Sequence, residues 1–329
     1  MMRKETVGDI GEFTLIERLS HDLLQRPERV VLGSGDDGAV YKARAGCDQV
    51  ISIDTMVEGV HFLSSTMSPE DVGYKLAAST ISDMAAMGAA PENLMISCAL
   101  PKDLPVEWVC RCYDGLRLCC QGMDVNILGG DTTRSLSGIT LTGVVTGIVP
   151  FGKAVLRSGA KPGDLVFVTG TVGDSAAGLD VIERKKENDF PGLVKKHRRP
   201  LPRVSWGEHL RKRGAHSLND ISDGLSSELF EIAKGSGVDM EIHAMALPLS
   251  GELLRWAKTK ERAWDYALSG GEDYELTGTM DPASFAALQS EMPITAIGLV
   301  TGKGEGRVYI TSGGKKQPLL PGGYDHFRT

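Results

Sequence analysis

The sequence predicts an α+β fold of two domains, in which mixed β-sheets are flanked by helices. A chain of 329 residues is long enough to form two separate hydrophobic cores. The predicted strands and helices do not alternate regularly, which favours mixed sheets over a doubly wound nucleotide-binding fold. Proline and glycine are frequent in residues 150–164, so we place the domain boundary there, between domains 1–150 and 151–329.

The clearest helix signal is the segment Ser68-Pro69-Glu70-Asp71. Ser68 can cap a helix, Pro69 suits the first helical position, and Asp71 completes a capping box. This helix should run to Met87 and end at Gly88. Apolar periodicity predicts further helices at residues 106–121, 175–184, 203–212, 226–234, 251–257 and 282–290. Apolar runs bounded by turn residues predict strands at residues 50–54, 94–99, 125–128, 139–148, 165–169, 240–243, 274–278 and 294–300.

Composition and charge are typical of an ordinary globular protein and exclude several classes. The net charge of −7 argues against a nucleic-acid surface, which would be basic. The most apolar run, residues 139–149, is too short to span a bilayer, and the amino terminus has no signal-peptide pattern. Six cysteines in a chain of this length do not form a disulfide framework. We therefore expect a reduced, cytoplasmic protein that binds neither nucleic acid nor membrane.

Two clusters have a simpler explanation than ligand binding. Cys110 and Cys112 are two residues apart in a predicted helix and face opposite sides of it, so buried packing is favoured over a shared metal. The basic run at residues 195–199 could contact phosphate, but such runs more often lie in solvated loops. We therefore predict a loop at this run.

The most informative feature is a set of short acidic clusters beside glycine, serine or threonine. Carboxylates next to small residues suit a hard cation such as Mg²⁺, which takes oxygen ligands and shares them with phosphate. No Gly-x-x-x-x-Gly-Lys-Ser/Thr loop is present, so nucleotide phosphates would be held mainly through metal. The clusters are Gly35-Asp36-Asp37-Gly38, Ser52-Ile53-Asp54-Thr55, Ser82-Asp83, Gly129-Gly130-Asp131-Thr132-Thr133, Asp220-Ile221-Ser222-Asp223-Gly224 and Gly270-Gly271-Glu272-Asp273.

Each cluster taken alone also has a purely structural explanation. Ser52 and Asp54 share one face of a predicted strand and could bind one metal, or they could simply end the strand in a turn. Asp83 lies near the carboxyl end of a helix, where a carboxylate is unfavourable unless a cation or solvent is close. Asp131 follows two glycines, which permit either the close approach of a ligand or a strand-end turn.

Helix capping is the structural alternative for two other positions. Asp174 is expected to cap the helix that follows it. Ser222 or Asp223 is a natural cap for helix 226–234, and the amide groups at that helix start could equally bind phosphate. The two interpretations of this second segment are compatible.

The joint occurrence of these motifs resembles the thiamine-monophosphate kinase family, of the superfamily that includes aminoimidazole-ribonucleotide synthetase and selenophosphate synthetase. The stretches 57–62 (Val-Glu-Gly-Val-His-Phe) and 270–276 (Gly-Gly-Glu-Asp-Tyr-Glu-Leu) distinguish this family from its relatives. The resemblance implies an aminoimidazole-ribonucleotide-synthetase-like fold and a homodimer formed through the first domains. It runs nearly end to end, through residues 11–13, 35–37, 54–62, 82–88, 129–133, 157–164, 220–225, 269–276 and 323–327.

The resemblance also implies ATP-dependent phosphorylation of thiamine monophosphate to thiamine diphosphate, with several Mg²⁺ ions and with K⁺ as a further candidate cofactor. The first domain would bind ATP and magnesium, and the second would complete the nucleotide and substrate site. Ile53 stands where relatives often carry threonine, so a side-chain ligand would be lost there but a carbonyl ligand would not. The implied magnesium ligands are Asp37, Ser52, Ile53, Asp54, Asp83, Asp131, Asp220 and Asp223. The implied ATP contacts are Tyr113, Gly130, Asp131, Arg157 and Ser222, and the implied thiamine-monophosphate contacts are His61, Glu272 and Tyr324.

The acceptor explains why no catalytic base is assigned. A phosphate monoester has a second pKa of about 6, so its oxygen is already nucleophilic at neutral pH. The two phosphates must instead approach against a repulsion of about 4 kcal/mol between unit charges ~4 Å apart at an effective dielectric of ~20. We therefore predict a direct in-line transfer in which metal ions align the two phosphates and Arg157 adds a fixed positive charge.

Two alternatives keep the same fold. A synthetase of the same superfamily would use ATP on another phosphorylated substrate, although the segments around His61 and Glu272 argue against it. A regulator that binds nucleotide or thiamine phosphate without turnover is disfavoured by the acidic clusters, while Ile53 leaves it open. Formation of thiamine diphosphate and ADP from Mg-ATP and thiamine monophosphate separates all three.

Overall fold

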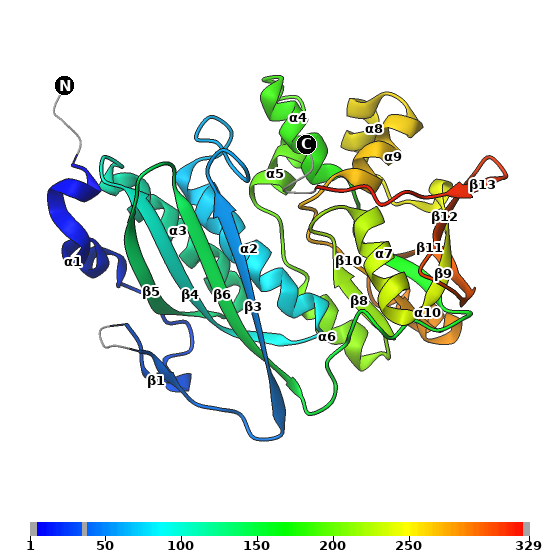
Figure 1. Ribbon diagram of the computed structural model, residues 1–329, viewed down its shortest axis with the longest axis horizontal. Coiled ribbons are helices and arrows are strands. Elements are labelled where there is room, and N and C mark those ends of the chain that lie inside the picture. The colour runs from blue at the N-terminus through cyan, green and yellow to red at the C-terminus, as the bar shows by residue number, and fades with distance from the viewer. Residues whose placement is uncertain (1–4, 35–37, 325–329) are drawn as a thin grey trace. The chain divides into compact units, whose positions relative to one another are not determined.

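The structure is a computed structural model that describes residues 5–34 and 38–324. Internal contacts divide the chain into two units, each built from a sheet and helices (Figure 1). The first unit contains residues 1–84 and 90–152, and the second contains residues 85–89 and 153–329. Both main sheets contain parallel and antiparallel strand pairs, so the predicted α+β class with mixed sheets is confirmed.

The first unit is a mixed four-stranded sheet with two long helices, α2 and α3, on one face (Figure 1). Its strands lie in the order β3-β6-β4-β5, and only β4 and β5 pair in parallel. A small hairpin of β1 and β2 lies outside this sheet. The elements are α1 (Val7–Leu19), a 3₁₀ turn (Pro27–Arg29), β1 (Val30–Leu32), β2 (Val40–Tyr41), β3 (Cys47–Val57), α2 (Pro69–Ala86), β4 (Ala90–Pro101), α3 (Val106–Met123), β5 (Asn126–Ser135) and β6 (Thr140–Pro150).

Glycines allow the two long helices of the first unit to approach closely. A Cβ atom at Gly73 of α2 would lie 1.8 Å from the carbonyl oxygen of Cys112, and one at Gly115 of α3 would lie 1.9 Å from that of Glu70. Of the four cysteines in α3, three are buried, Cys110 is partly exposed, and all are free thiols. Buried packing is therefore confirmed for Cys112, Cys119 and Cys120, whereas Cys110 is only partly buried.

The second unit is a seven-stranded sheet with the strand order β13-β12-β9-β11-β7-β10-β8. Alternate residues of β7 face opposite sides: Val168 packs in a core with α7, whereas Phe167 packs in a core with α6 and α10. A third core joins α4, α5, α8 and α9. The elements are β7 (Leu165–Thr169), α4 (Asp174–Glu183), α5 (Pro191–Arg198), α6 (Val204–Lys212), β8 (Ser217–Asp220), α7 (Leu225–Ser236), β9 (Val238–His243), a 3₁₀ turn (Ala244–Ala246), α8 (Gly251–Ala257), α9 (Lys260–Ser269), β10 (Leu276–Met280), α10 (Pro282–Leu288), β11 (Ile294–Lys303), β12 (Val308–Ser312) and β13 (Lys315–Pro318).

Several local predictions can be compared with these elements. The start of α2 is as predicted, because the amide of Asp71 donates to the Ser68 hydroxyl at 3.2 Å. The predicted strand 274–278 is wrong at its start: Tyr274 has a φ of +49°, so strand β10 begins only at Leu276. In the part of the chain that the structure describes, no helix has the length and apolarity needed to cross a bilayer.

Three further expectations are wrong. The basic run 195–199 is not a solvated loop, since most of it forms α5, in which His197 is buried. Asp174 is the first residue of α4 rather than its cap, because Gly173 occupies the cap position. Neither Ser222 nor Asp223 caps α7, because Gly224 stands there with a φ of +125° that favours glycine.

Candidate functional site

In the first unit, two of the three predicted metal ligands on β3, Ser52 and Asp54, face helix α2. Ser52 and Asp54 are half-buried, whereas the residues between and beside them are exposed, as expected for side chains that alternate along a strand. The Ser52 hydroxyl donates a hydrogen bond to the carboxylate of Asp83. Asp83 lies in the last turn of α2, which contains no basic residue. Two predicted ligands are therefore in direct contact, and Asp54 lies on the same face of the strand.

Ile53 is on the opposite face of β3. Its side chain is 62% exposed, and its strand neighbour Ile51 is 70% exposed. The Ile53 side chain therefore points away from the face that carries Ser52 and Asp54. Any contribution of Ile53 to an ion on that face is restricted to main-chain atoms, so the absence of threonine at this position removes no side-chain ligand there.

Gly130 and Asp131 line a cavity of about 300 Å³ on the side of the sheet away from α2 and α3. A Cβ atom at Gly130 would lie 1.7 Å from the carbonyl oxygen of Ile96, so only glycine fits between β4 and the cavity. Asp131 itself is exposed and lies beside Ser97 in the parallel β4–β5 register. The prediction that the glycine pair permits close approach is consistent with this geometry.

Tyr113, the remaining predicted ATP contact of this unit, is mainly a core residue. Its side chain is 7% exposed on α3, and its hydroxyl lies 4.0 Å from the sulfur of Cys98. Burial raises the pKa of the Tyr113 phenol well above its ordinary value. Only a small part of this side chain can reach a ligand from within this unit.

His61 is held by the end of β3. The amide of Val57 donates to His61 Nδ1 at 3.0 Å, so this nitrogen is an acceptor. In the neutral ring, Nε2 then carries the proton and acts as a donor. A donor of this kind suits a phosphate oxygen better than it suits the role of a base.

In the second unit, main-chain hydrogen bonds bring three distant segments together. The amide of Glu272 donates to the carbonyl of Ser222 at 2.6 Å, and the amide of Tyr274 donates to that of Ile221 at 2.9 Å. The amide of Tyr324 donates to the carbonyl of Asp223 at 3.1 Å. Four predicted site residues, from the 220–224 cluster, the 270–273 cluster and the carboxyl-terminal segment, therefore lie side by side.

The backbone at Glu272 is strained. Glu272 has a φ of +67° and Tyr274 a φ of +49°, which is the left-handed backbone region that residues other than glycine rarely adopt. Such conformations persist where the surrounding structure enforces them, and they often mark functional sites. The carboxylate of Glu272 lies 3.7 Å from Nδ1 of the buried His197.

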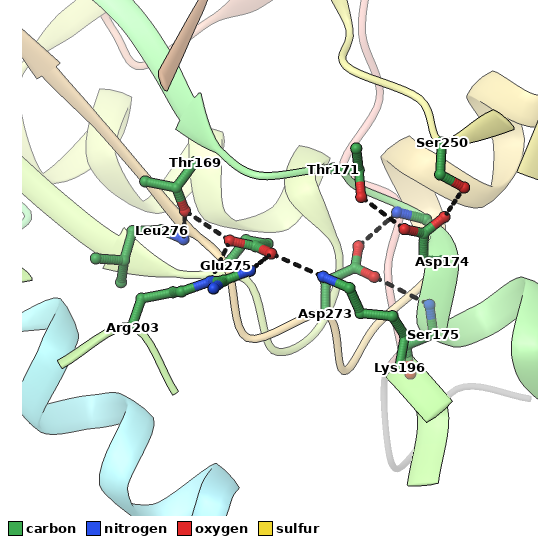
Figure 2. A network of polar contacts seen from close by, with 11 residues as sticks. Thr169, Thr171, Asp174, Ser175, Lys196, Arg203, Ser250, Asp273, Glu275 and Leu276 are labelled. Carbon is green, nitrogen blue, oxygen red and sulfur yellow. Dashed lines mark hydrogen bonds and ion pairs between the residues drawn. The ribbon is translucent and has the colours of Figure 1, made fainter. Parts of the chain in front are cut away.

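The two carboxylates that follow Glu272 anchor this turn (Figure 2). Asp273 accepts hydrogen bonds from the amides of Gly173 at 2.6 Å and Ser175 at 3.1 Å, which ties the turn to the start of α4. Burial raises the pKa of Asp273 to about 8. Glu272 is therefore held in place by Asp273, a member of the same acidic cluster to which the sequence assigned no separate role.

Glu275 is the centre of the same network (Figure 2). Arg203 donates to it through two nitrogens, Lys196 approaches it at 3.0 Å, and the Thr169 hydroxyl donates at 2.8 Å. Arg203 also stacks on Trp206, with its guanidinium carbon 4.2 Å from the ring centroid. The basic run around Lys196 is thus used in part to neutralise a buried carboxylate.

Arg157 and Ser222, both predicted ATP contacts, are linked through Asn219 and Glu228, which the sequence did not indicate. The Ser222 hydroxyl donates to Glu228 at 3.5 Å. Arg157 Nε donates to Asn219 at 3.1 Å, and Asn219 donates to Glu228. Burial raises the pKa of Glu228 to about 7. The only sequence feature that could have indicated Glu228 is its position in the first turn of the helix that follows the acidic cluster 220–224.

The predicted ligand set is therefore divided. Ser52, Ile53, Asp54, Asp83 and Asp131 belong to the first unit, and Asp220 and Asp223 to the second, whereas Asp37 lies outside the described residues. Among residues 5–34 and 38–324, no group of three or more His, Cys, Asp and Glu side chains lies close enough to hold a metal ion.

Comparisons with known proteins agree with the fold and the motifs. Residues 35–149 match the family of AIR synthase related proteins in its N-terminal domain, and residues 161–311 match the C-terminal domain of that family. Together these matches define an AIR synthase related protein. The chain belongs more narrowly to the thiamine-monophosphate kinase family, which confirms the resemblance noted in the sequence.

Three relatives support this assignment. The chain is 39% identical to thiamine-monophosphate kinase of Bacillus subtilis, over 97% of this chain and 100% of the relative. It is 41% identical to thiamine-monophosphate kinase of Escherichia coli strain K12, over 97% and 99% of the two chains. A solved structure of AaThiL complexed with AMPPCP and TMP superposes with a TM-score of 0.78 at 35% identity, covering 97% of this chain and 98% of that one.

Proposed function

We propose that this protein transfers a phosphoryl group from ATP to thiamine monophosphate, which gives thiamine diphosphate and ADP. The observation that carries the proposal is the convergence of Ser222, Asp223, Glu272 and Tyr324 in a chain similar to a protein solved with AMPPCP and TMP. The test is to incubate the purified protein with Mg-ATP and thiamine monophosphate and to measure both products. Release of ADP without thiamine diphosphate would instead favour a synthetase with another acceptor.

The chemistry requires positioning more than proton transfer. The acceptor phosphate is largely a dianion at neutral pH, because its second pKa is about 6. Arg157 supplies a positive charge whose orientation is set by Asn219. His61, with Nδ1 accepting from the main chain, presents a donor rather than a base. These groups can hold and align phosphate oxygens for in-line transfer.

The donor set of the first unit fits magnesium. Ser52, Asp54 and Asp83 offer only oxygen atoms, and the negative end of the α2 dipole lies close to Asp83. Bound magnesium would neutralise phosphate charge as donor and acceptor approach. Asp220 and Asp223 offer further carboxylates from the second unit. Activity measured after chelation, and again after adding back Mg²⁺ with or without K⁺, tests both ions.

Replacement of Tyr324 by alanine should raise the KM for thiamine monophosphate by roughly 5- to 150-fold, since stacking on an aromatic ring contributes about 1–3 kcal/mol. The Tyr324 side chain is 53% exposed, while its main chain is fixed beside Asp223. The KM for ATP should stay unchanged. Steady-state kinetics with each substrate varied in turn provides the measurement, and an equal rise in both constants contradicts the assignment.

We also propose that the protein is a homodimer formed through the face of the first-unit sheet that α2 and α3 do not cover. Ile53, Val144 and Met95 form a cross-strand row on this face, and Ile51 beside them is 70% exposed. An apolar row of this kind on a sheet is typical of a protein–protein contact. Sedimentation of the purified chain, with Ile53→Glu as the disrupting variant, tests the dimer.

The positions of Asp54 and Asp131 suggest that the dimer completes the site. Asp54 is on edge strand β3 and Asp131 on the opposite edge strand β5, with β6 and β4 between them. Three strand spacings of about 4.8 Å place them roughly 14 Å apart, too far to share an ion within one copy. A second copy could bring its own β5 to β3 of the first.

Complementation should reveal this sharing. Asp54→Asn and Asp131→Asn chains should each be inactive, but dimers that contain one of each would regain one intact site. Refolding or co-expressing equal amounts should restore about a quarter of wild-type activity, because half of randomly formed dimers are mixed. If verified mixed dimers remain inactive, Asp54 and Asp131 must act in a site formed by one chain.

We further propose that the protein works in the cytoplasm. All six cysteines are free, and four of them are buried. Disulfide bonds are rare in reducing compartments, where free buried thiols persist. Cell fractionation followed by the kinase assay tests this location.

A further inference from the structure

Glu228 of α7 is a buried carboxylate to which the proposed reaction gives no direct role. Its exposed fraction is 4%. A buried carboxylate is unfavourable unless hydrogen-bond donors surround it. Three donors do so: the side-chain amide of Asn219, the main-chain amide of Asp223 at 3.3 Å and the hydroxyl of Ser222 at 3.5 Å. Two of these donors belong to the segment that carries proposed ATP and magnesium contacts.

A second link extends from Glu228 to Arg157. Arg157 Nε donates to the side-chain oxygen of Asn219 at 3.1 Å, while the nitrogen of the same amide donates to Glu228. Because one end of the amide must accept and the other must donate, both neighbours fix its orientation. The other carboxylate near Arg157, Glu231 at 3.7 Å, is about half exposed, and such pairs contribute little.

We propose that Glu228 is a positioning residue that orients Arg157 and the Ser222–Asp223 turn together for binding the phosphates of a nucleoside triphosphate. The inference rests on the proposed function for the identity of the ATP contacts. One carboxylate holds the turn directly and holds the guanidinium through Asn219. A cationic group and a hydroxyl-bearing turn at a helix start are the groups that bind phosphate.

Substitution by glutamine should break this arrangement without changing the side-chain volume. A carboxylate can accept from all three donors, whereas glutamine has one accepting oxygen and one donating nitrogen. Whichever way the amide is turned, its nitrogen faces either the Asn219 amide or the Asp223 amide. In the Glu228→Gln protein, either the Asn219 amide or the Asp223 amide therefore loses its hydrogen-bond acceptor.

The structural alternative is that Glu228 only stabilises the start of α7. It accepts the Asp223 amide, which lies immediately before the cap residue Gly224. A residue with this role alone would lower thermal stability when changed and would leave nucleotide affinity unaltered. The two roles therefore predict different outcomes for binding.

The experiment is calorimetric titration of Mg·AMPPCP into the full-length protein and its variants. Glu228→Gln should raise the Kd by roughly 10-fold or more, in the range seen for residues that orient ligands through a second contact. Asn219→Ala should give a smaller rise, because it releases Arg157 and leaves the Glu228–Asp223 contact. Glu231→Gln is the matched control, with the same substitution one turn along α7, and should leave the Kd unchanged. Melting temperatures verify that each variant is folded.

Two further readouts separate the possible failures. In a kinase assay, Glu228→Gln should raise the KM for ATP more than the KM for thiamine monophosphate. In an Arg157→Ala background, the effect of Glu228→Gln on the Kd should shrink, because the link from Glu228 to Arg157 through Asn219 is already lost. A folded Glu228→Gln protein with wild-type Kd overturns the inference. A wild-type protein that binds Mg·AMPPCP but makes no thiamine diphosphate overturns the proposed function, and the Glu228 effect on the Kd would still stand.

Discussion

Asp54→Asn is expected to lower kcat by at least ~100-fold while the protein remains folded, because even indirect changes around a metal cost about 10–100-fold. Asp54 is half-buried beside Ser52 on the face of β3 that meets Asp83. Asparagine keeps the size of the side chain but removes the negative charge that a divalent ion requires. Steady-state kinetics at saturating Mg-ATP and thiamine monophosphate provides the measurement.

The matched control for this variant is Asp48→Asn, the same change on the same strand. Asp48 accepts the Gly152 amide at 2.7 Å, a bond that asparagine can also accept, and it lies at the far end of β3. Its activity should be close to wild type. If Asp54→Asn retained similar activity, Asp54 could not be a magnesium ligand.

Glu275→Gln is expected to lower the free energy of unfolding of the second unit by about 3–5 kcal/mol, the range for removing one partner of a buried ion pair. Its side chain is 1% exposed, and its partner Arg203 is 14% exposed. Without the carboxylate, a buried guanidinium and the ammonium of Lys196 lose their counter-charge. Urea unfolding followed by tryptophan fluorescence measures the loss, and Trp206, stacked on Arg203, reports on this region.

Glu241→Gln is the control for this second variant. Glu241 pairs with Lys316 at 2.7 Å on the surface of the same sheet, and a solvent-exposed pair contributes about 0–1 kcal/mol. A Glu275→Gln protein no less stable than this control would show that the buried charges are solvated or neutralised in another way. It would also remove the support that we assign to the strained turn at Glu272.

Periodicity and capping patterns predicted many elements well where the signal is local. Helix α8 (Gly251–Ala257) begins and ends at the predicted residues, and strand β7 (Leu165–Thr169) does as well. Elements whose formation depends on distant partners were missed. Helix α5 was interpreted as a loop because its basic residues look solvated, but His197 is buried and Lys196 meets Glu275, 79 residues away. Strand β8 (Ser217–Asp220) is short and mostly polar, and it pairs with β10 more than fifty residues later.

The site follows the same division. The acidic clusters indicated Ser52, Asp83, Ser222 and Glu272, because carboxylates beside small residues are typical of phosphate and metal chemistry, whereas Tyr324 was implied only by the family resemblance. Their local environments could not be inferred. The side of β3 that faces α2, the cavity beside Asp131 and the strained φ of Glu272 each result from packing between elements.

By itself the sequence determined the α+β class, the family and the residue types of the proposed site. Composition, periodicity and motif spacing can all be read along the chain without knowledge of its three-dimensional contacts. Only the tertiary structure identified Asn219, Glu228, Asp273 and Glu275 as the residues that hold the site. Each of them acts through hydrogen bonds that depend on burial and on partners brought close by the fold. Burial decides whether a carboxylate is an ordinary surface charge or a fixed anchor, because the free energy of an ionised group depends on how far solvent is excluded from it.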